Sequence, residues 1–79
     1  MGTKSEIVLI KQTLAAGRLT VPDKSTGYYR SIYACCPSEG HESPVHRIER
    51  SGISISRVIF QCPICSVQFD TRPENMFLR

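Results

Sequence analysis

The stretch that decides the fold is residues 59–70, which read Ile-Phe-Gln-Cys-Pro-Ile-Cys-Ser-Val-Gln-Phe-Asp. Two residues separate Cys62 from Cys65, and a proline follows the first cysteine. This spacing lets the chain turn sharply enough for both thiolates to face one ion. Strand-like runs flank the turn on both sides. The stretch therefore predicts a metal-binding knuckle between two strands.

The chain has 79 residues and four cysteines, so we expect one small fold whose core is marginal without disulfides or a metal. Residues 1–16 lack a signal-peptide pattern, because the apolar run at residues 7–10 is only four residues long. No run approaches the roughly eighteen apolar residues of a membrane span. We therefore expect a cytoplasmic, reduced protein with no membrane partner, whose cysteines bind metal.

A tetrahedral ion bound by Cys62 and Cys65 needs two further ligands, which must come from residues 35–46. If Cys36-Pro37 is matched to Cys62-Pro63, Cys36 becomes a ligand. Glu39 then stands where the second cysteine would be, and His41 supplies the missing ligand. The preferred set is Cys36, His41, Cys62 and Cys65.

The second register matches residues 32–35 to residues 59–62 and makes Cys35 the ligand, together with His41. A set using both Cys35 and Cys36 requires the chain to bend, because neighbouring strand residues point to opposite faces. His46 is a weaker candidate, expected at the start of a strand. Two disulfides, an iron site of the rubredoxin kind and thiol exchange at Cys62 and Cys65 are further alternatives.

The strand, C-P-x-C knuckle and strand of residues 59–70, with an upstream Cys-Pro turn and an intervening hairpin, resemble a zinc ribbon. The resemblance covers residues 32–70, and the first knuckle departs from the usual paired C-x-x-C. It implies one structural Zn²⁺ and a small, metal-stabilised, mainly β fold of ribbon-like hairpin and knuckles. We expect an N-terminal segment of residues 1–31, a ribbon-like domain of residues 32–72 and a tail of residues 73–79.

The N-terminal segment, a short helix or strands, is expected to pack on the ribbon. Residues 5–16 fit a helix ended by Gly17, although the β-branched run at residues 7–10 argues equally for a strand. Residues 18–21 and 28–34 have strand character.

The central hairpin is expected to comprise Val45–Arg50, a Ser51-Gly52 turn and Ile53–Gln61, with Ile53 and Ile55 on its buried face. The apolar residues of the tail either fold back to complete the core or form a docking motif.

The net charge of +3 is mildly basic and offers two candidate contact surfaces. The first is formed by hairpin arginines, which can bind phosphate or an acidic protein: Arg47, Arg50 and Arg57. The second is an aromatic and cationic patch that can stack on bases, with Tyr33 beside it: Tyr28, Tyr29 and Arg30. Core packing of at least one or two of the three tyrosines is the favoured alternative for this patch.

We do not expect an enzyme or a small-molecule substrate, because the four protein ligands leave the ion no open position and the chain has no phosphate-binding glycine loop. Many zinc ribbons act in transcription or translation, and the resemblance implies a module that contacts nucleic acid or a nucleic-acid-handling complex. The alternative is a protein-interaction module, or a small regulatory subunit, with a purely structural zinc.

Overall fold

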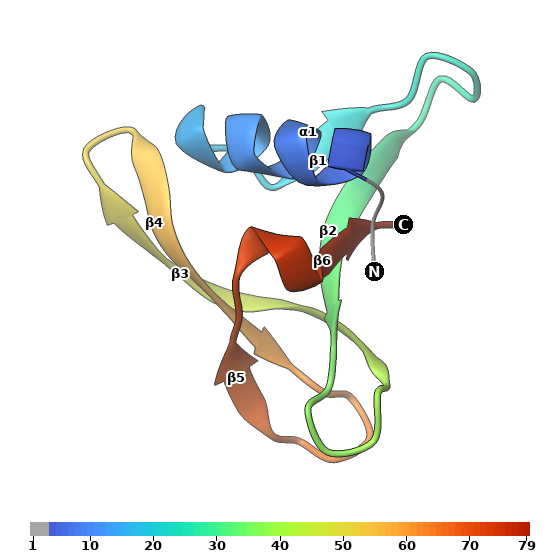
Figure 1. Ribbon diagram of the computed structural model, residues 1–79, viewed down its shortest axis with the longest axis vertical. Coiled ribbons are helices and arrows are strands. Elements are labelled where there is room, and N and C mark those ends of the chain that lie inside the picture. Colours follow the sequence, from blue (N-terminus) through green and yellow to red (C-terminus); the bar gives the residue numbers. More distant parts are fainter. Residues whose placement is uncertain (1–3) are drawn as a thin grey trace.

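The computed structural model describes residues 4–79; the first three residues of the predicted N-terminal segment lie outside the described residues. In the described residues a helix is followed by six strands of three to ten residues, with a 3₁₀-helix before the last (Figure 1). In chain order the elements are α1 (Lys4–Ala15), β1 (Thr20–Pro22), β2 (Tyr29–Cys35), β3 (Glu42–Ser51), β4 (Ser54–Gln61), β5 (Gln68–Asp70), η1 (Pro73–Asn75) and β6 (Met76–Leu78). The predicted mainly β fold with an N-terminal segment packed on it is confirmed.

The N-terminal segment forms a helix, so the strand interpretation of residues 7–10 is wrong. Ile10 and Leu14 are buried on one face of α1, at the spacing of a helical turn. The helix ends in a Schellman motif, in which the N–H of Arg18 donates to the carbonyl of Thr13 and Gly17 adopts a φ of +78°. The expected role of Gly17 at the helix end is confirmed.

All strands pair antiparallel in the order β1-β2-β3-β4-β5, and β6 pairs separately with β2. The N–H of Ser31 donates to Arg79, and that of the next residue, Ile32, donates to Leu19. Since successive N–H groups of a strand point to opposite sides, β6 lies along the edge of β2 opposite β1. β2 is thus enclosed between the C-terminal strand and the rest of the sheet.

The central hairpin is present, but its turn consists of Gly52 and Ile53 rather than Ser51 and Gly52. Gly52 has a φ of +66°, and a positive φ at the first loop position alone is the pattern of a type II′ turn. The prediction that Ile53 lies on the buried face is wrong, because it occupies the turn and is 79% exposed. Ile55 is buried as expected.

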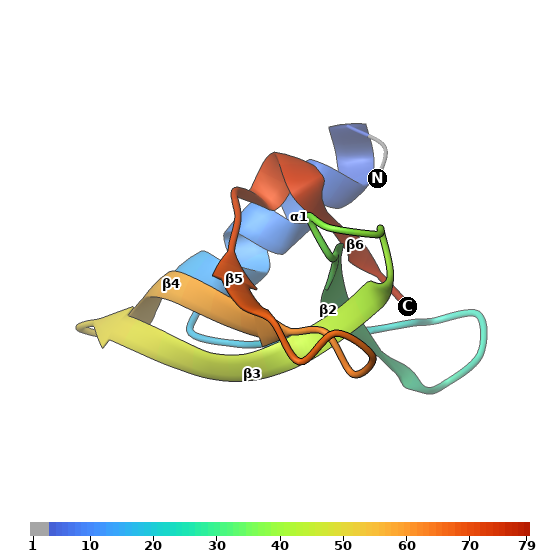
Figure 2. The same ribbon diagram turned by 90° about the horizontal axis from the view of Figure 1, so that it is seen from below.

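Two irregularities bend the hairpin. The register shifts between Val45 and Arg47 on β3, and again between Glu49 and Arg50 opposite β4. Such bulges increase the local twist of a strand pair. Figure 2 shows the result, a curved β3–β4 hairpin with α1 and η1 on one face; no described element covers the other face.

One hydrophobic core joins all three predicted segments of the chain. Its buried members are Ile10, Leu14, Val21, Ile32, Ala34, Ile55, Val58, Phe60, Met76 and Leu78. The tail therefore folds back into the core, and the docking-motif alternative is wrong. The N–H of Leu78 also donates to the carboxylate of Glu6 at 2.6 Å, which ties the last strand to α1. Within residues 4–79, no helix has the length and apolarity that crossing a membrane requires.

Candidate metal centre

The second knuckle connects β4 to β5, and its backbone is closed by two hydrogen bonds. The N–H of Ser66 donates to the carbonyl of Cys62 at 2.9 Å, and the N–H of Cys62 donates to the carbonyl of Val67 at 3.0 Å. Ser66 adopts a left-handed φ of +63°. The backbone N–H of Cys65 donates to Sγ of Cys62, with a nitrogen-to-sulfur distance of 3.3 Å. The loop therefore presents both thiols on its inner side.

The first knuckle connects β2 to β3 and repeats this backbone pattern. The N–H of Gly40 donates to the carbonyl of Cys36, and the N–H of Cys36 donates to the carbonyl of His41, both at 2.8 Å. Gly40 has a φ of +75° at the place of Ser66. By this equivalence Glu39 occupies the place of Cys65, and the histidine occupies the place of Val67. The register that matches Cys36 to Cys62 describes the loop correctly.

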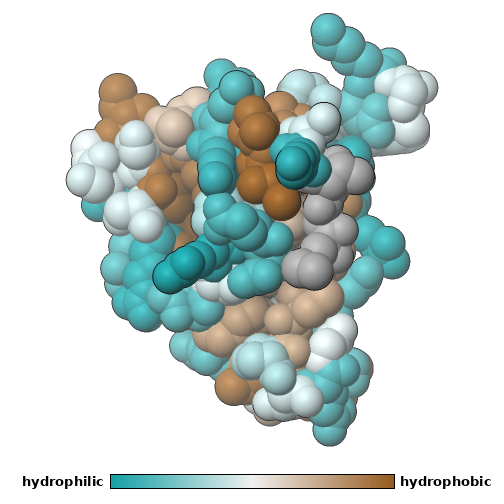
Figure 3. Space-filling view, viewed as in Figure 1, coloured by the Kyte–Doolittle hydropathy of each residue, from teal (hydrophilic) through white to brown (hydrophobic). Residues whose placement is uncertain are grey.

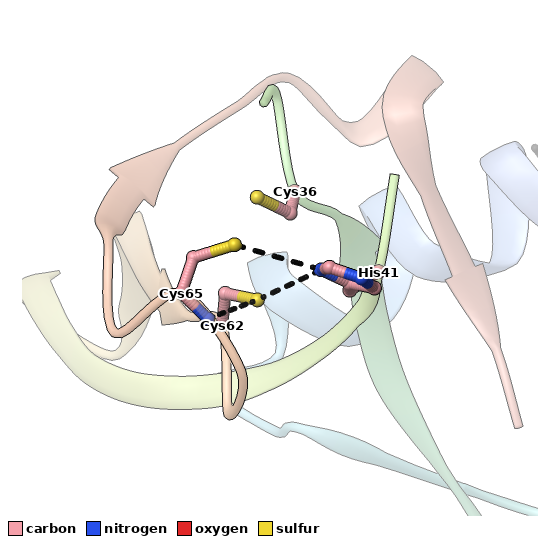
Figure 4. Close-up of side chains that lie close together, drawn as sticks. All are labelled: Cys36, His41, Cys62 and Cys65. Atoms are coloured by element: carbon pink, nitrogen blue, oxygen red, sulfur yellow. Dashed lines mark hydrogen bonds between the residues drawn. The ribbon is translucent and has the colours of Figure 1, made fainter. Parts of the chain in front are cut away.

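The two knuckles bring the four residues of the preferred set together at the end of the molecule opposite α1 (Figures 1 and 4). Their ligand atoms, three Sγ and one imidazole nitrogen, lie within 4.8 Å of one another. Nδ1 of His41 is 3.5 Å from Sγ of Cys62 and 3.6 Å from Sγ of Cys65. A tetrahedral ion at about 2.3 Å from sulfur and about 2.0 Å from nitrogen places these atoms roughly 3.5 Å apart. The spacing therefore fits one four-coordinate ion.

The alternative ligands lie elsewhere. Cys35 is exposed at the end of β2, paired with Glu42, and does not belong to the cluster. Its neighbour Cys36 is buried, as strand alternation requires. Nε2 of His46 lies 3.4 Å from the side-chain nitrogen of Gln68, outside the cluster. All four cysteines are free of disulfides.

The second knuckle also separates the acidities of its two thiols. Burial alone would raise the pKa of Cys62, but N–H groups of Cys65 and Ile64 and the side chain of His41 stabilise its thiolate and lower the pKa to about 6. Although Cys65 is an exposed residue, desolvation of its sulfur, and then the neighbouring sulfurs of Cys62 and Cys36, raise its pKa to about 12. An ion that binds both residues as thiolates must therefore displace a proton from Cys65 at neutral pH.

The predicted hairpin arginines differ in their surroundings. Arg57 Nε lies 2.8 Å from an Asp70 carboxylate oxygen and its Nη1 lies 3.6 Å from Glu49, so its charge is compensated. The hydrogen bond from Arg57 also lowers the pKa of Asp70. Arg50 donates to the carbonyls of Gly17 and Ile53, which joins the hairpin tip to the end of α1.

Arg47 is exposed on β3, and among residues 4–79 it has neither an ion pair nor a side-chain hydrogen bond. It is the one hairpin arginine whose guanidinium has no protein partner within the described residues.

The aromatic patch is more exposed than expected. Tyr28 and Tyr29 are 77% and 71% exposed, so the favoured core packing is wrong for both. The inner face of β2 is already filled by its buried alternate residues, and Tyr29 points the other way. Tyr33 is half-buried and stacks on Phe77 with ring centroids 6.2 Å apart. Arg30 donates to the carbonyl of Leu78 at 2.8 Å.

Sequence reasoning missed two partners in these surfaces. Asp70 was not expected to neutralise Arg57, because the register of β5 on β4, with Asp70 opposite Ile59, decides that contact. Phe77 was not expected to stack on Tyr33, because the pairing of the tail with β2 decides it. The run of three apolar residues at positions 76–78 indicated that the tail could pack on the core, but so short a run does not distinguish a strand.

The four Cys and His residues thus lie close enough to bind one metal ion, an arrangement compatible with a zinc-binding fold. Comparison of the chain with protein-family models, with curated proteins and with solved structures finds no match.

Proposed function

We propose that this chain is a non-catalytic zinc-binding module of the zinc-ribbon kind that contacts nucleic acid or a nucleic-acid-handling complex. The observation that carries the proposal is the convergence of four ligand atoms from two equivalent knuckles. Three thiolates and one imidazole suit tetrahedral Zn²⁺, since soft sulfur ligands in this geometry select zinc or iron–sulfur chemistry over harder ions.

The proposed role of the ion is structural. Four protein ligands complete a tetrahedron and leave no position for a substrate or a reactive water. The two knuckles are separated by the β3–β4 hairpin, so one ion bridges the end of β2 to the end of β4. Metal binding to such sites contributes directly to folding free energy.

The exposed aromatic patch supports the nucleic-acid contact. Tyr28 and Tyr29 present most of their surface to solvent, and the half-buried Tyr33 lies on the same face of β2 as Tyr29. Unpaired bases stack on such side chains with about 1–3 kcal/mol per base. Arg47 adds an uncompensated charge on the hairpin, and the chain without the ion carries a formal net charge of +3. Single strands therefore suit these surfaces better than duplex.

A protein partner is the second candidate, favoured by the balanced charges of the hairpin. Glu49 and Asp70 compensate Arg57, which weakens the hairpin as a phosphate-binding surface. Ile53 in the hairpin turn and Ile64 in the second knuckle are exposed apolar side chains. On the face seen in Figure 3, however, apolar groups form separate patches among hydrophilic ones rather than one broad surface.

The test is a titration of the zinc-loaded protein with single-stranded and duplex oligonucleotides at two salt concentrations. We expect single strands to bind more tightly, with affinity that falls as salt rises. The double substitution Tyr28→Ala with Tyr29→Ala should weaken binding about tenfold or more, since each lost stack costs at least about 1 kcal/mol. Affinity weaker than about millimolar at low salt, or no salt dependence, would favour the protein-partner candidate.

A further inference from the structure

The imidazole of His41 has a second nitrogen, whose surroundings the metal centre alone does not explain. Nδ1 faces the sulfurs of Cys62 and Cys65, while Nε2 lies 3.5 Å from Oε2 of Glu39. The two sulfurs thus face one ring nitrogen of His41, and the Glu39 carboxylate faces the other. His41 belongs to the first knuckle, and its side chain is about one-quarter exposed.

We propose that Glu39 is the positioning residue of the metal centre: its carboxylate accepts a hydrogen bond from the Nε2–H group of His41 and so presents Nδ1 to the ion. The proposal rests on the proposed zinc site. An imidazole that binds an ion through one nitrogen carries its proton on the other, and a carboxylate at that position fixes both the tautomer and the ring orientation.

The equivalence of the two knuckles explains why a carboxylate stands there. In the second knuckle the residue before the left-handed position is Cys65, which is a ligand; in the first knuckle that residue is Glu39. The carboxylate of Glu39 is not among the four clustered ligand atoms. In the first knuckle the second ligand is therefore His41, two residues after the position that corresponds to Cys65. Glu39, which occupies that position, supports the His41 ring instead.

Exposure sets the expected size of the effect. Loss of such a supporting group typically weakens metal binding by about 10- to 100-fold. The Glu39 side chain is 66% exposed, so water competes for the Nε2 proton and the lower end of that range applies. The expected loss for Glu39→Ala is therefore about tenfold in zinc affinity.

The test compares Glu39→Ala and Glu39→Gln with the control Glu42→Ala. Glu42 is an exposed acid on β3 whose carboxylate pairs with Arg79, whereas the His41 ring pairs with Glu39, so removal of Glu42 changes the net charge equally but leaves that pair in place. Zinc affinity is measured by competition with a chromophoric chelator. Long-range ¹⁵N–¹H spectra of the zinc-loaded proteins report which ring nitrogen binds the ion and which carries the proton.

In the wild type we expect Nδ1 to bind and Nε2 to carry the proton. Glu39→Ala should lose about tenfold in affinity and shift the Nε2 proton resonance, Glu39→Gln should retain part of the affinity through its amide oxygen, and Glu42→Ala should match the wild type. Equal affinities for Glu39→Ala and Glu42→Ala, or binding through Nε2, would overturn the proposal while leaving the zinc site intact. A wild type that takes up no zinc would instead refute the site, and the role of Glu39 with it.

Discussion

Cys35 and Cys36 are neighbours in the sequence with opposite environments. Cys36 is buried in the knuckle beside His41, whereas Cys35 points to the exposed face of β2. The proline after Cys36 indicated the correct register, and strand alternation accounts for the exclusion of Cys35. The scarcity of large side chains in the sequence suggested that tyrosines would be needed in the core. Tyr29 is exposed nonetheless, because the smaller residues Ile32 and Ala34 fill the inner face of its strand.

The buried and the exposed cysteines allow a matched pair of substitutions, Cys62→Ser and Cys35→Ser. We predict that Cys62→Ser abolishes metal binding and unfolds the chain, since it removes a fully buried ligand whose metal contributes folding energy on the order of 10 kcal/mol. Cys35→Ser should bind metal and fold like the wild type. Metal stoichiometry and ¹H–¹⁵N spectra check both. Retention of the wild-type spectrum by Cys62→Ser, or loss of metal by Cys35→Ser, contradicts the ligand assignment.

The two knuckles are the elements that define the centre, and their equivalence can be tested by moving a ligand. We predict that His41→Ala loses tight metal binding and that adding Glu39→Cys restores it, because position 39 corresponds to Cys65 and Gly40 already supplies the left-handed turn. The measurement is the absorption spectrum of the cobalt-substituted proteins. The sulfur-to-metal charge-transfer absorption of the double variant should exceed that of the wild type, because the double variant has four thiolate ligands and the wild type has three. A double variant that binds no better than His41→Ala would show that the loops are not equivalent.

The contact between α1 and the β3–β4 hairpin depends on a glycine. A Cβ at Gly17 would lie 2.4 Å from the carbonyl oxygen of Ile53, whereas a Cβ at Gly27, which has the same φ of +78°, would meet nothing within 4 Å. Alanine at either position therefore costs about 1–2 kcal/mol of stability through the left-handed backbone conformation. Only alanine at position 17 adds a steric clash. This close approach could not be read from the sequence, because the turn was expected one residue earlier and Ile53 in the strand.

We predict that Gly17→Ala lowers the free energy of unfolding by about 1–3 kcal/mol more than Gly27→Ala does, because the inserted methyl group forces the helix end away from the hairpin. Urea denaturation of the two metal-loaded variants measures the difference. An equal loss of unfolding free energy in the two variants would contradict the prediction, because it would mean that the end of α1 can shift away from the hairpin without loss of stability.

Across the whole molecule, the metal centre and the hydrophobic core share the same strands. Ala34 and Phe60 lie in the core, and each is followed two residues later by a cysteine of the Cys/His cluster. The sequence predicted the Cys/His cluster well, because cysteine and proline spacing is a local signal. It left open where the tail and the N-terminal segment pack, because pairing of β6 with β2 and contact of α1 with the hairpin join residues far apart in the chain.

We propose that one ion joins the two knuckles and that the fold depends on it. The most direct measurement is elemental analysis of the purified protein, followed by ¹H–¹⁵N spectra before and after a strong chelator under reducing conditions. We predict one zinc per chain, and loss of the dispersed spectrum when the zinc is removed, because the core of so small a chain is marginal by itself. A spectrum that stays dispersed after chelation, or sulfurs found joined in disulfides, would contradict the claim.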